Sequence, residues 1–335
     1  MTVYDDVSAR ARGLATHLLV AGEWTALAAA PDLPALLARL EGAREPLRLR
    51  PLLPEAAALE RAVRRRAAAR LALLARWCGD RPALRTSIFG DEDRRSLRAL
   101  LRGAAAGAAP EARLAGTLPT PSLPLRALET LASQPNVPAV SALLTAWSHP
   151  LAPALQGAPQ RGPPDLLVLE AALTRAFAAG ALAAARRADA ALRTYLAGLV
   201  DMENVLAALA LTLAPSELAP DAVLVAGGNV PLAMLERVAR AHAGLPALRA
   251  AEEAFRDTLF AASFTELEPS RLAERLAGKL RAQVHRLART DPLGSGPVLD
   301  YVLGLRAEVQ RFQRLAWGLS LGAPLHHRLA EVAPG

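Results

Sequence analysis

Residues 124–132, Pro-Leu-Arg-Ala-Leu-Glu-Thr-Leu-Ala, return further along the chain as residues 231–239, Pro-Leu-Ala-Met-Leu-Glu-Arg-Val-Ala. The sequence upstream of each copy matches as well, because Ala-Pro-Glu-Ala-Arg-Leu at 109–114 pairs with Ala-Pro-Asp-Ala-Val-Leu at 219–224. Two segments that match in the same order, with only a small slip in spacing, indicate an internal repeat. The chain is therefore predicted to be a repeat protein.

Acidic residues extend the repeat to three copies. The period is close to a third of the chain, so three copies cover almost all of its 335 residues. Such a period exceeds the roughly 20–50 residues of solenoid repeats, so each copy is large enough to be a small helical domain. We predict helical repeat domains at 1–115, 116–225 and 226–335. The marker sets are Glu60 with Asp93 and Ser96, Glu170 with Asp201 and Asn204, and, in a degenerate third copy, Glu274 with Arg306 and Glu308.

Helical periodicity dominates the chain. Apolar residues recur at steps of three and four from Leu192 to Leu209, which predicts a helix over about 186–213. Aromatic residues make up only 4% of the chain, so the core must be built from Leu, Ala and Val, which suits packed helices. The predicted fold class is all-α, with proline-rich breaks at 31–34, 51–54, 119–124 and 159–164. Further helices are predicted at 59–76, 96–102, 166–178, 232–243, 270–288 and 297–317.

The net charge of +7 raises nucleic acid as a partner, but the bases are almost all arginine, with Lys279 the only lysine. Together with the abundance of Ala, Leu, Pro and Gly, this composition is typical of a GC-rich genome. Aromatic residues are not interleaved with the arginines as stacking platforms would require. No nucleic acid is expected, although an Arg-rich helical nucleic-acid-binding or scaffold protein stays the alternative.

The single Cys78 excludes an internal disulfide framework and agrees with a reducing compartment. The first six residues lack the basic flank and apolar run of a secretory signal. Apolar stretches such as 205–214 reach about ten residues, whereas a membrane span needs about 20. We expect a cytoplasmic protein that meets a bilayer only at its surface or through a partner.

Candidate chemistry is sparse, and we expect no catalytic residue, cofactor or metal site. His326, His327 and Glu331 have helical metal-ligand spacing, but nothing else supports a metal, and a terminal amphipathic turn is favoured. Gly227-Gly228-Asn229 lacks the Lys and Ser/Thr of a phosphate loop, so it indicates a tight turn. An α-helical enzyme would instead gather titratable residues from several helices, which the sequence does not indicate.

Two groups of charged residues remain. Asp93 and Asp201 stand at equivalent repeat positions ahead of apolar runs, which favours helix capping or a polar contact between helices over catalysis. A second group forms a basic face on one helix and is read either as a solvated surface or as a partner-docking patch. This second group consists of Arg61, Arg64, Arg65, Arg66 and Arg70.

Several short strings together resemble the C subunit family of V/A-type rotary ATPases, whose eukaryotic member is called the d subunit. Tyr4 with 9–13 resembles its N-terminal opening, and 149–155 resembles one of its central motifs. Tyr195 to Asn204, which includes Val200-Asp201-x-Glu203-Asn204, is similar to another. Asp291-Pro292-Leu293-Gly294, with Tyr301-Val302 and Glu308, resembles its C-terminal motif.

This resemblance covers nearly the full chain and implies three similar helical domains in a funnel-like, pseudo-threefold arrangement. It implies a non-catalytic rotor adaptor that seats the central-stalk subunits D and F on the membrane proteolipid ring and transmits torque. The machine would carry protons or sodium ions, and the protein would lie peripherally on the cytoplasmic face of the membrane. The matched motif residues Asp93, Asp201, Glu203, Asn204 and Glu308 are expected to be structural.

Overall fold

The computed structural model describes residues 4–41, 56–156, 165–213, 218–266 and 268–332, and the predicted breaks at 51–54 and 159–164 lie outside them. Within these ranges the chain forms helices and no strand, so the all-α prediction is confirmed. The long helices are α4 (Ala56–Cys78), α5 (Pro82–Ala105), α9 (Leu166–Ala184), α10 (Ala190–Leu213), α13 (Pro269–Thr290) and α14 (Gly296–Ser320). The shorter elements are α1 (Asp5–Ala15), α2 (Ala21–Ala28), α3 (Leu33–Glu41), α6 (Pro110–Arg113), α7 (Leu125–Ala132), α8 (Val137–Ala146), η1 (Ala152–Leu155), η2 (Pro220–Ala222), α11 (Leu232–Ala239), α12 (Leu245–Ala254) and α15 (Leu325–Val332).

The predicted helices are found with shifted ends. The expected helix at 96–102 lies in the second half of α5, which begins at Pro82. Proline is tolerated in the first turn, because the backbone N–H that it lacks would have no partner within the helix. In α10 the predicted stripe is buried, with Leu192, Tyr195, Leu196 and Leu199 each at most 2% exposed. Apolar periodicity thus placed the long helices but not their ends, because in α5 the charged run from Asp91 to Arg95 interrupts the apolar pattern.

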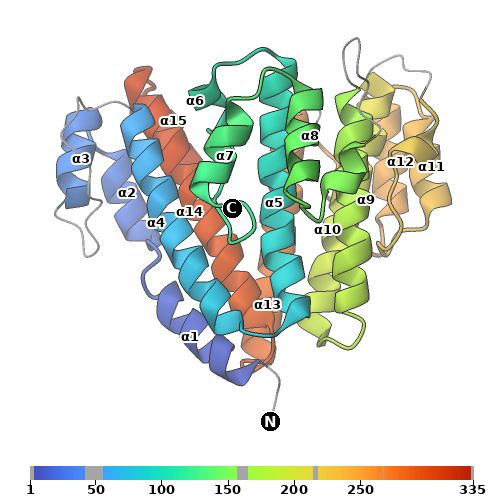
Figure 1. The fold of residues 1–335 in the computed structure, drawn as a ribbon, viewed down its shortest axis with the longest axis horizontal. Helices are drawn as coiled ribbons and strands as arrows, with labels where there is room; N and C mark the ends of the chain where they lie inside the picture. Colours follow the sequence, from blue (N-terminus) through green and yellow to red (C-terminus); the bar gives the residue numbers. More distant parts are fainter. Residues whose placement is uncertain (1–3, 42–55, 157–164, 214–217, 267, 333–335) are drawn as a thin grey trace.

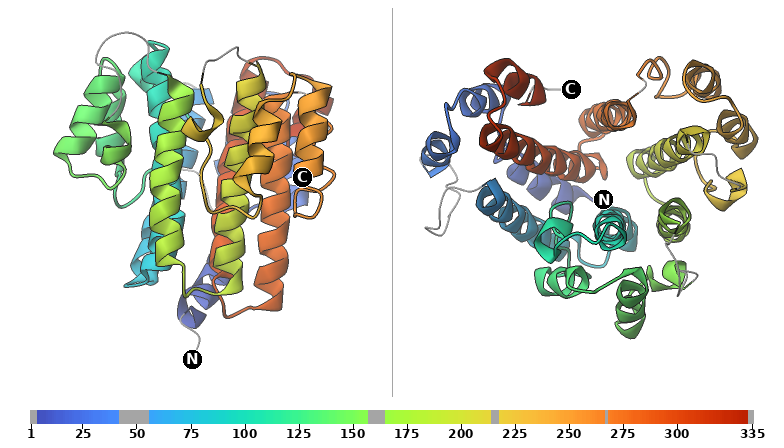
Figure 2. Two further views of the ribbon diagram at one scale, coloured as in Figure 1. Left: turned by 90° about the vertical axis from the view of Figure 1, so that its right-hand side faces the viewer. Right: turned by 90° about the horizontal axis from the view of Figure 1, so that it is seen from above.

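The six long helices contact one another in a closed cycle. Each of α4–α5, α9–α10 and α13–α14 is a hairpin, and its first helix packs on the second helix of another hairpin. The contacts are α9 on α5, α13 on α10 and α4 on α14, so the third hairpin returns to the first (Figure 2, right). The body is narrower at the end near α1 and wider at the opposite end, toward α6, α8 and α12 (Figure 1). The funnel-like arrangement and the three domain boundaries stay predictions.

Helices from the two ends of the chain pack together. α1 contacts α4 and α14, and α2 contacts α15. Trp24 of α2 is 2% exposed, and its ring centroid lies 4.7 Å from that of Phe312 in α14. The short helices beside α14 therefore include α2 and α3, which come from the start of the chain.

Two described helices, α9 and α10, are long and apolar enough to cross a membrane by length and composition, with mean hydropathy 1.6. The sequence predicted uninterrupted apolar stretches of only about ten residues. The two helices are longer because a high mean hydropathy allows one or two charged residues within the stretch. In the most apolar 18-residue stretch of each helix, 44% of the residues of α9 and 56% of those of α10 are already buried inside the molecule. Both carry buried carboxylates, Glu170 and Asp201. Core helices of soluble proteins meet the same criterion, so the two helices are weak evidence for a span.

Candidate functional site

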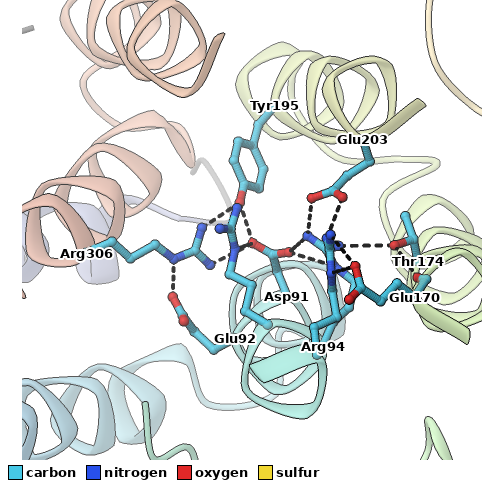
Figure 3. A network of polar contacts seen from close by, with 10 residues as sticks. Asp91, Glu92, Arg94, Glu170, Thr174, Tyr195, Glu203 and Arg306 are labelled. Atoms are coloured by element: carbon cyan, nitrogen blue, oxygen red, sulfur yellow. Dashed lines mark hydrogen bonds and ion pairs between the residues drawn. The ribbon is translucent and has the colours of Figure 1, made fainter. Parts of the chain in front are cut away.

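A buried ion network lies where α5, α10 and α14 meet (Figure 3). At its centre, Asp91 of α5 is 0% exposed. The Asp91 carboxylate accepts hydrogen bonds from Arg94 at 2.7 Å and from the Tyr195 hydroxyl of α10 at 3.2 Å. It also pairs with Arg306 of α14, whose Nη2 lies 2.7 Å from Oδ2. One carboxylate thus joins the second helices of all three hairpins.

The network continues from α5 to α9 and α10. The Arg94 guanidinium, also 0% exposed, donates to Thr174 Oγ1 of α9 at 3.1 Å and to Glu203 of α10 at 2.9 Å. On the other side of α5, Arg306 donates to Glu92. Because guanidinium groups present several donors in a rigid fork, each arginine can bridge carboxylates on different helices.

Ion pairing outweighs burial in setting the pKa values of the carboxyl groups in this network. Burial alone would raise the pKa of Asp91, but Arg95, Arg306 and Arg94 outweigh it and hold that pKa well below its usual range. For Glu203, Arg94 and Arg98 likewise overcome burial and lower the pKa to about 2. Burial, together with Asp91, raises the pKa of Tyr195 to about 12, so its phenol keeps the proton that it donates. All of these groups hold a fixed charge state near neutral pH.

Two of the three seams between hairpins contain an equivalent glutamate. At the α5–α9 seam, Glu170 pairs with Arg98 at 2.8 Å and accepts from Arg102 at 2.6 Å. At the α4–α14 seam, Glu60 accepts from Gln313 at 2.9 Å and from Trp317 at 3.2 Å. The two glutamates stand at equivalent positions of the repeat, and in each seam the two partners lie one helical turn apart. The predicted repeat therefore extends to the side-chain contacts between hairpins in these two seams.

The third seam, between α10 and α13, contains a close apolar contact. Leu280 of α13 is 2% exposed and packs against Gly198 of α10. A Cβ on Gly198 would lie 2.9 Å from Leu280 Cδ1, so glycine is what permits this close approach. This seam is thus held at Gly198 by an apolar contact, unlike the seams that contain Glu60 and Glu170.

Asp93 and Asp201 hold equivalent loops, and the capping alternative is wrong because both lie inside long helices rather than at their starts. Asp93 accepts from the hydroxyls of Thr120 and Ser122, just ahead of α7. Asp201 accepts from the backbone amides of Asn229 at 3.0 Å and Val230 at 3.1 Å, just ahead of α11. The polar-contact alternative agrees with these bonds.

A second pair of residues repeats one turn later. The Asn204 side chain exchanges two bonds of 2.8 Å with the backbone of Val225, and Ser96 bonds both backbone groups of Leu118. Burial raises the pKa of Asp201, although its bonds to Val230 and Asn229 act in the opposite direction. The structural role predicted for Asp93, Asp201 and Asn204 stays a prediction, which these contacts support.

Glu308 of α14 is the third member of the acidic series. It accepts from the backbone amide of Leu19 at 2.9 Å, just ahead of α2. It also accepts from Arg66 at 3.1 Å and Arg70 at 3.0 Å, both in α4. Asp93, Asp201 and Glu308 thus each bind the segment that leads into a short helix, and for Glu308 that segment comes from the beginning of the chain.

The five arginines predicted as one basic face of α4 separate in the structure. Arg64 and Arg70 are buried, with 6% and 7% exposed, and Arg64 pairs with Glu60 at 2.8 Å. Arg66 is half-buried on Glu308. Arg61 and Arg65 are exposed. Any docking role on this helix therefore narrows to Arg61 and Arg65, and it stays a prediction.

The arrangement of these groups is suited to holding helices in register. Sequence reasoning uses Glu170 and Arg306 only as repeat markers and misses Asp91, Glu92 and Arg94. Their signal is a run of charges, Asp91 to Arg95, inside a segment that is otherwise helical and apolar on both sides.

The residues considered for a metal site do not gather into one. In the part of the chain that the structure describes, no group of three or more His, Cys, Asp or Glu could hold a metal ion. The rings of His326 and His327 face each other edge to face, with centroids 4.4 Å apart. Glu331, considered with them, pairs instead with Arg314 at 3.0 Å.

Comparison with known proteins gives two kinds of match. The profile of the ATP synthase (C/AC39) subunit family matches residues 7–325. The C subunit of V-type ATP synthase from each of two strains of Thermus thermophilus is 36% identical over 186 residues. These residues are 54% of this chain and 54% of each relative, so the chain spans about half the length of the curated relatives it matches.

Proposed function

Because the chain belongs to the ATP synthase (C/AC39) subunit family, we propose that it is a non-catalytic rotor adaptor of a V/A-type ATPase or ATP synthase. It joins the central-stalk subunits D and F to the proteolipid ring at the cytoplasmic face of the membrane. It transmits torque between ATP turnover and proton or sodium transport. The name of the Thermus relatives, as the C subunit of a V-type ATP synthase, supports the assignment to such a machine.

One observation supports the mechanical part of the proposal best, namely that Asp91 joins α5, α10 and α14 in the interior of the molecule. A rotor part must not deform while it carries torque. Interiors are close-packed and transmit strain, and paired buried charges resist displacement because an unpaired buried charge is costly. The closed cycle of helix contacts adds to this, since no hairpin is held at one side only.

Partner binding must come from surfaces larger than any single charged pair. An exposed ion pair contributes only about 0–1 kcal/mol, so a stable seat for the stalk needs an interface above roughly 1,000 Å². Arg61 and Arg65 are the exposed members of the predicted docking patch and are proposed as contacts within such an interface.

The test is a mixture of the purified chain with subunits D and F, analysed by size-exclusion chromatography at low and moderate salt. A stoichiometric complex is expected at both. Arg61→Glu combined with Arg65→Glu is expected to weaken the complex about tenfold. Arg249→Glu with Arg256→Glu, two exposed arginines elsewhere, serves as the charge-matched control. Failure of the unaltered chain to form any complex contradicts the adaptor proposal, and equal weakening by both double variants contradicts docking at Arg61 and Arg65.

A further inference from the structure

The narrow end of the molecule brings together α1 and the three turns of the long hairpins, at 79–81, 185–189 and 291–295 (Figure 1). Asp6 of α1 pairs with Arg81 of the first turn at 2.6 Å. Asp189 of the second turn accepts from Ser295 Oγ of the third at 2.6 Å. Ser8 of α1 donates to the Gly294 carbonyl at 2.5 Å. These contacts place all four segments on one surface, which we call the turn face.

The turn face carries a surplus of exposed arginines. The six arginines listed at the end of this paragraph have no carboxylate partner among the residues that the structure describes. By contrast, the exposed Arg237 and Arg240 near α11 pair with Glu253 and Glu236. The exposed arginines of the turn face include Arg76, Arg85, Arg186, Arg187, Arg286 and Arg289.

The carboxylates of the turn face offset part of this positive charge, and one of them, Asp6, is paired with an arginine. Asp189 accepts from Ser295 and from the backbone amide of Leu192 at 3.0 Å. Asp291 accepts from the backbone amide of Gly294 at 3.0 Å, and Asp6 pairs with Arg81. Counting Arg81, the seven arginines still outnumber the five carboxylates, so the turn face keeps a surplus of positive charge that is available to an anionic partner. The five carboxylates are Asp5, Asp6, Asp80, Asp189 and Asp291.

An apolar side chain stands among these charges. Leu293, in the third turn, is 49% exposed although it is a large hydrophobic residue. Basic groups around an exposed apolar tip suit a bilayer surface, where the charges meet headgroups and the tip enters the headgroup boundary. A nucleic acid would match the arginines but would leave Leu293 without a partner.

We propose that the turn face binds the surface of an anionic phospholipid bilayer directly. This goes beyond the adaptor function, since that function requires only protein partners. Each arginine near an anionic bilayer strengthens binding by about fivefold. A few arginines contacting headgroups at once thus give specific attachment at low salt, which falls as salt rises.

The experiment is sedimentation of the full chain with vesicles of phosphatidylcholine alone or of equal parts phosphatidylcholine and phosphatidylglycerol. Binding to the anionic vesicles only, lost at high salt, is expected. The test variant combines Arg186→Gln, Arg187→Gln, Arg286→Gln and Arg289→Gln, and it should weaken vesicle binding about 100-fold or more. The control variant combines Arg237→Gln, Arg240→Gln, Arg249→Gln and Arg256→Gln, which removes the same charge elsewhere and should leave binding within a few-fold. Circular dichroism checks that both variants keep their helices.

A second variant separates lipid from other polyanions. Leu293→Ser should weaken binding to anionic vesicles and leave any binding to duplex DNA unchanged. No sedimentation of the unaltered chain with anionic vesicles overturns the proposal, as does equal weakening by the two quadruple variants. It is equally overturned if duplex DNA binds as tightly as the vesicles and Leu293→Ser alters neither. None of these outcomes touches the adaptor function, whose test uses soluble subunits D and F without lipid.

Discussion

At the scale of single residues, Asp91 is the side chain that links three of the long helices. It is fully buried and faces Arg94, Arg95, Arg306 and the Tyr195 hydroxyl. Buried ion pairs are not in themselves strongly stabilising, because desolvation offsets their attraction. Removing one partner is costly, however, since the remaining charges stay buried.

Asp91→Asn should therefore lower the free energy of unfolding by about 3–5 kcal/mol. The control is Asp6→Asn, which removes a carboxylate with 45% side-chain exposure from its pair with Arg81 and should cost about 0–1 kcal/mol. Urea unfolding followed by circular dichroism measures both. A cost below about 1 kcal/mol for Asp91→Asn would mean that the network relaxes around the missing charge.

The lowered pKa of Glu203 predicts an acid-dependent loss of stability. A carboxyl whose folded pKa is about 2, against an ordinary value of 4.5, contributes stability that is fully present above about pH 4.5. That contribution is lost as pH falls toward 2. It is on the order of 3 kcal/mol at neutral pH, from about 1.4 kcal/mol per pKa unit. The difference in stability between the unaltered chain and Glu203→Gln should shrink as urea titrations move from pH 7 to pH 3, and a constant difference would contradict this prediction.

At the scale of elements, the short helices are attached to the long ones through carboxylates that bind the loops before them. The loop before α11 passes so close to α10 that a Cβ on Gly228 would overlap the Asp201 carboxylate. Glycine is required here by space rather than by backbone conformation. The bonds from Asn229 and Val230 to Asp201 depend on that approach.

Gly228→Ala should consequently destabilise the protein by about 1–3 kcal/mol, because the loop must move off Asp201 or the carboxylate must turn away. The matched control is Gly278→Ala inside α13, where a Cβ meets nothing within 4 Å. That change should stabilise by about 0.5–1 kcal/mol, since alanine favours a helix interior. Thermal unfolding compares the two, and a neutral Gly228→Ala would show that the loop is not held by Asp201.

At the scale of the whole molecule, the closed cycle of helix contacts predicts cooperative unfolding. The four tryptophans, Trp24, Trp77, Trp147 and Trp317, lie outside α9 to α12. Fluorescence therefore reports on the other helices, whereas circular dichroism reports on all of them. The two urea transitions should coincide if the seams couple the hairpins. A separate transition seen by circular dichroism alone would mean that α9 to α12 unfold as an independent unit.

Three of the family-motif residues named from the sequence lie in the interior of the molecule. Asp201, Asn204 and Glu308 are buried with partners, which agrees with their expected structural role.

The basic patch was predicted less well, because helical spacing shows which residues share a face but not what covers that face. Arg64 and Arg70 are buried by their pairs with Glu60 and Glu308, and Glu308 is distant from Arg70 in the sequence.

The sequence by itself determined the helical class and the approximate positions of the long helices, and it predicted a threefold repeat. These properties follow from apolar periodicity and from residue spacing along one chain, which are local or purely sequential. Only the tertiary structure decided which charges are buried together, that α2 and α3 complete the surroundings of α14, and that the three hairpins close into a cycle. Those features depend on contacts between residues far apart in the chain, such as Asp91 with Arg306 and Leu19 with Glu308, and no local pattern specifies them.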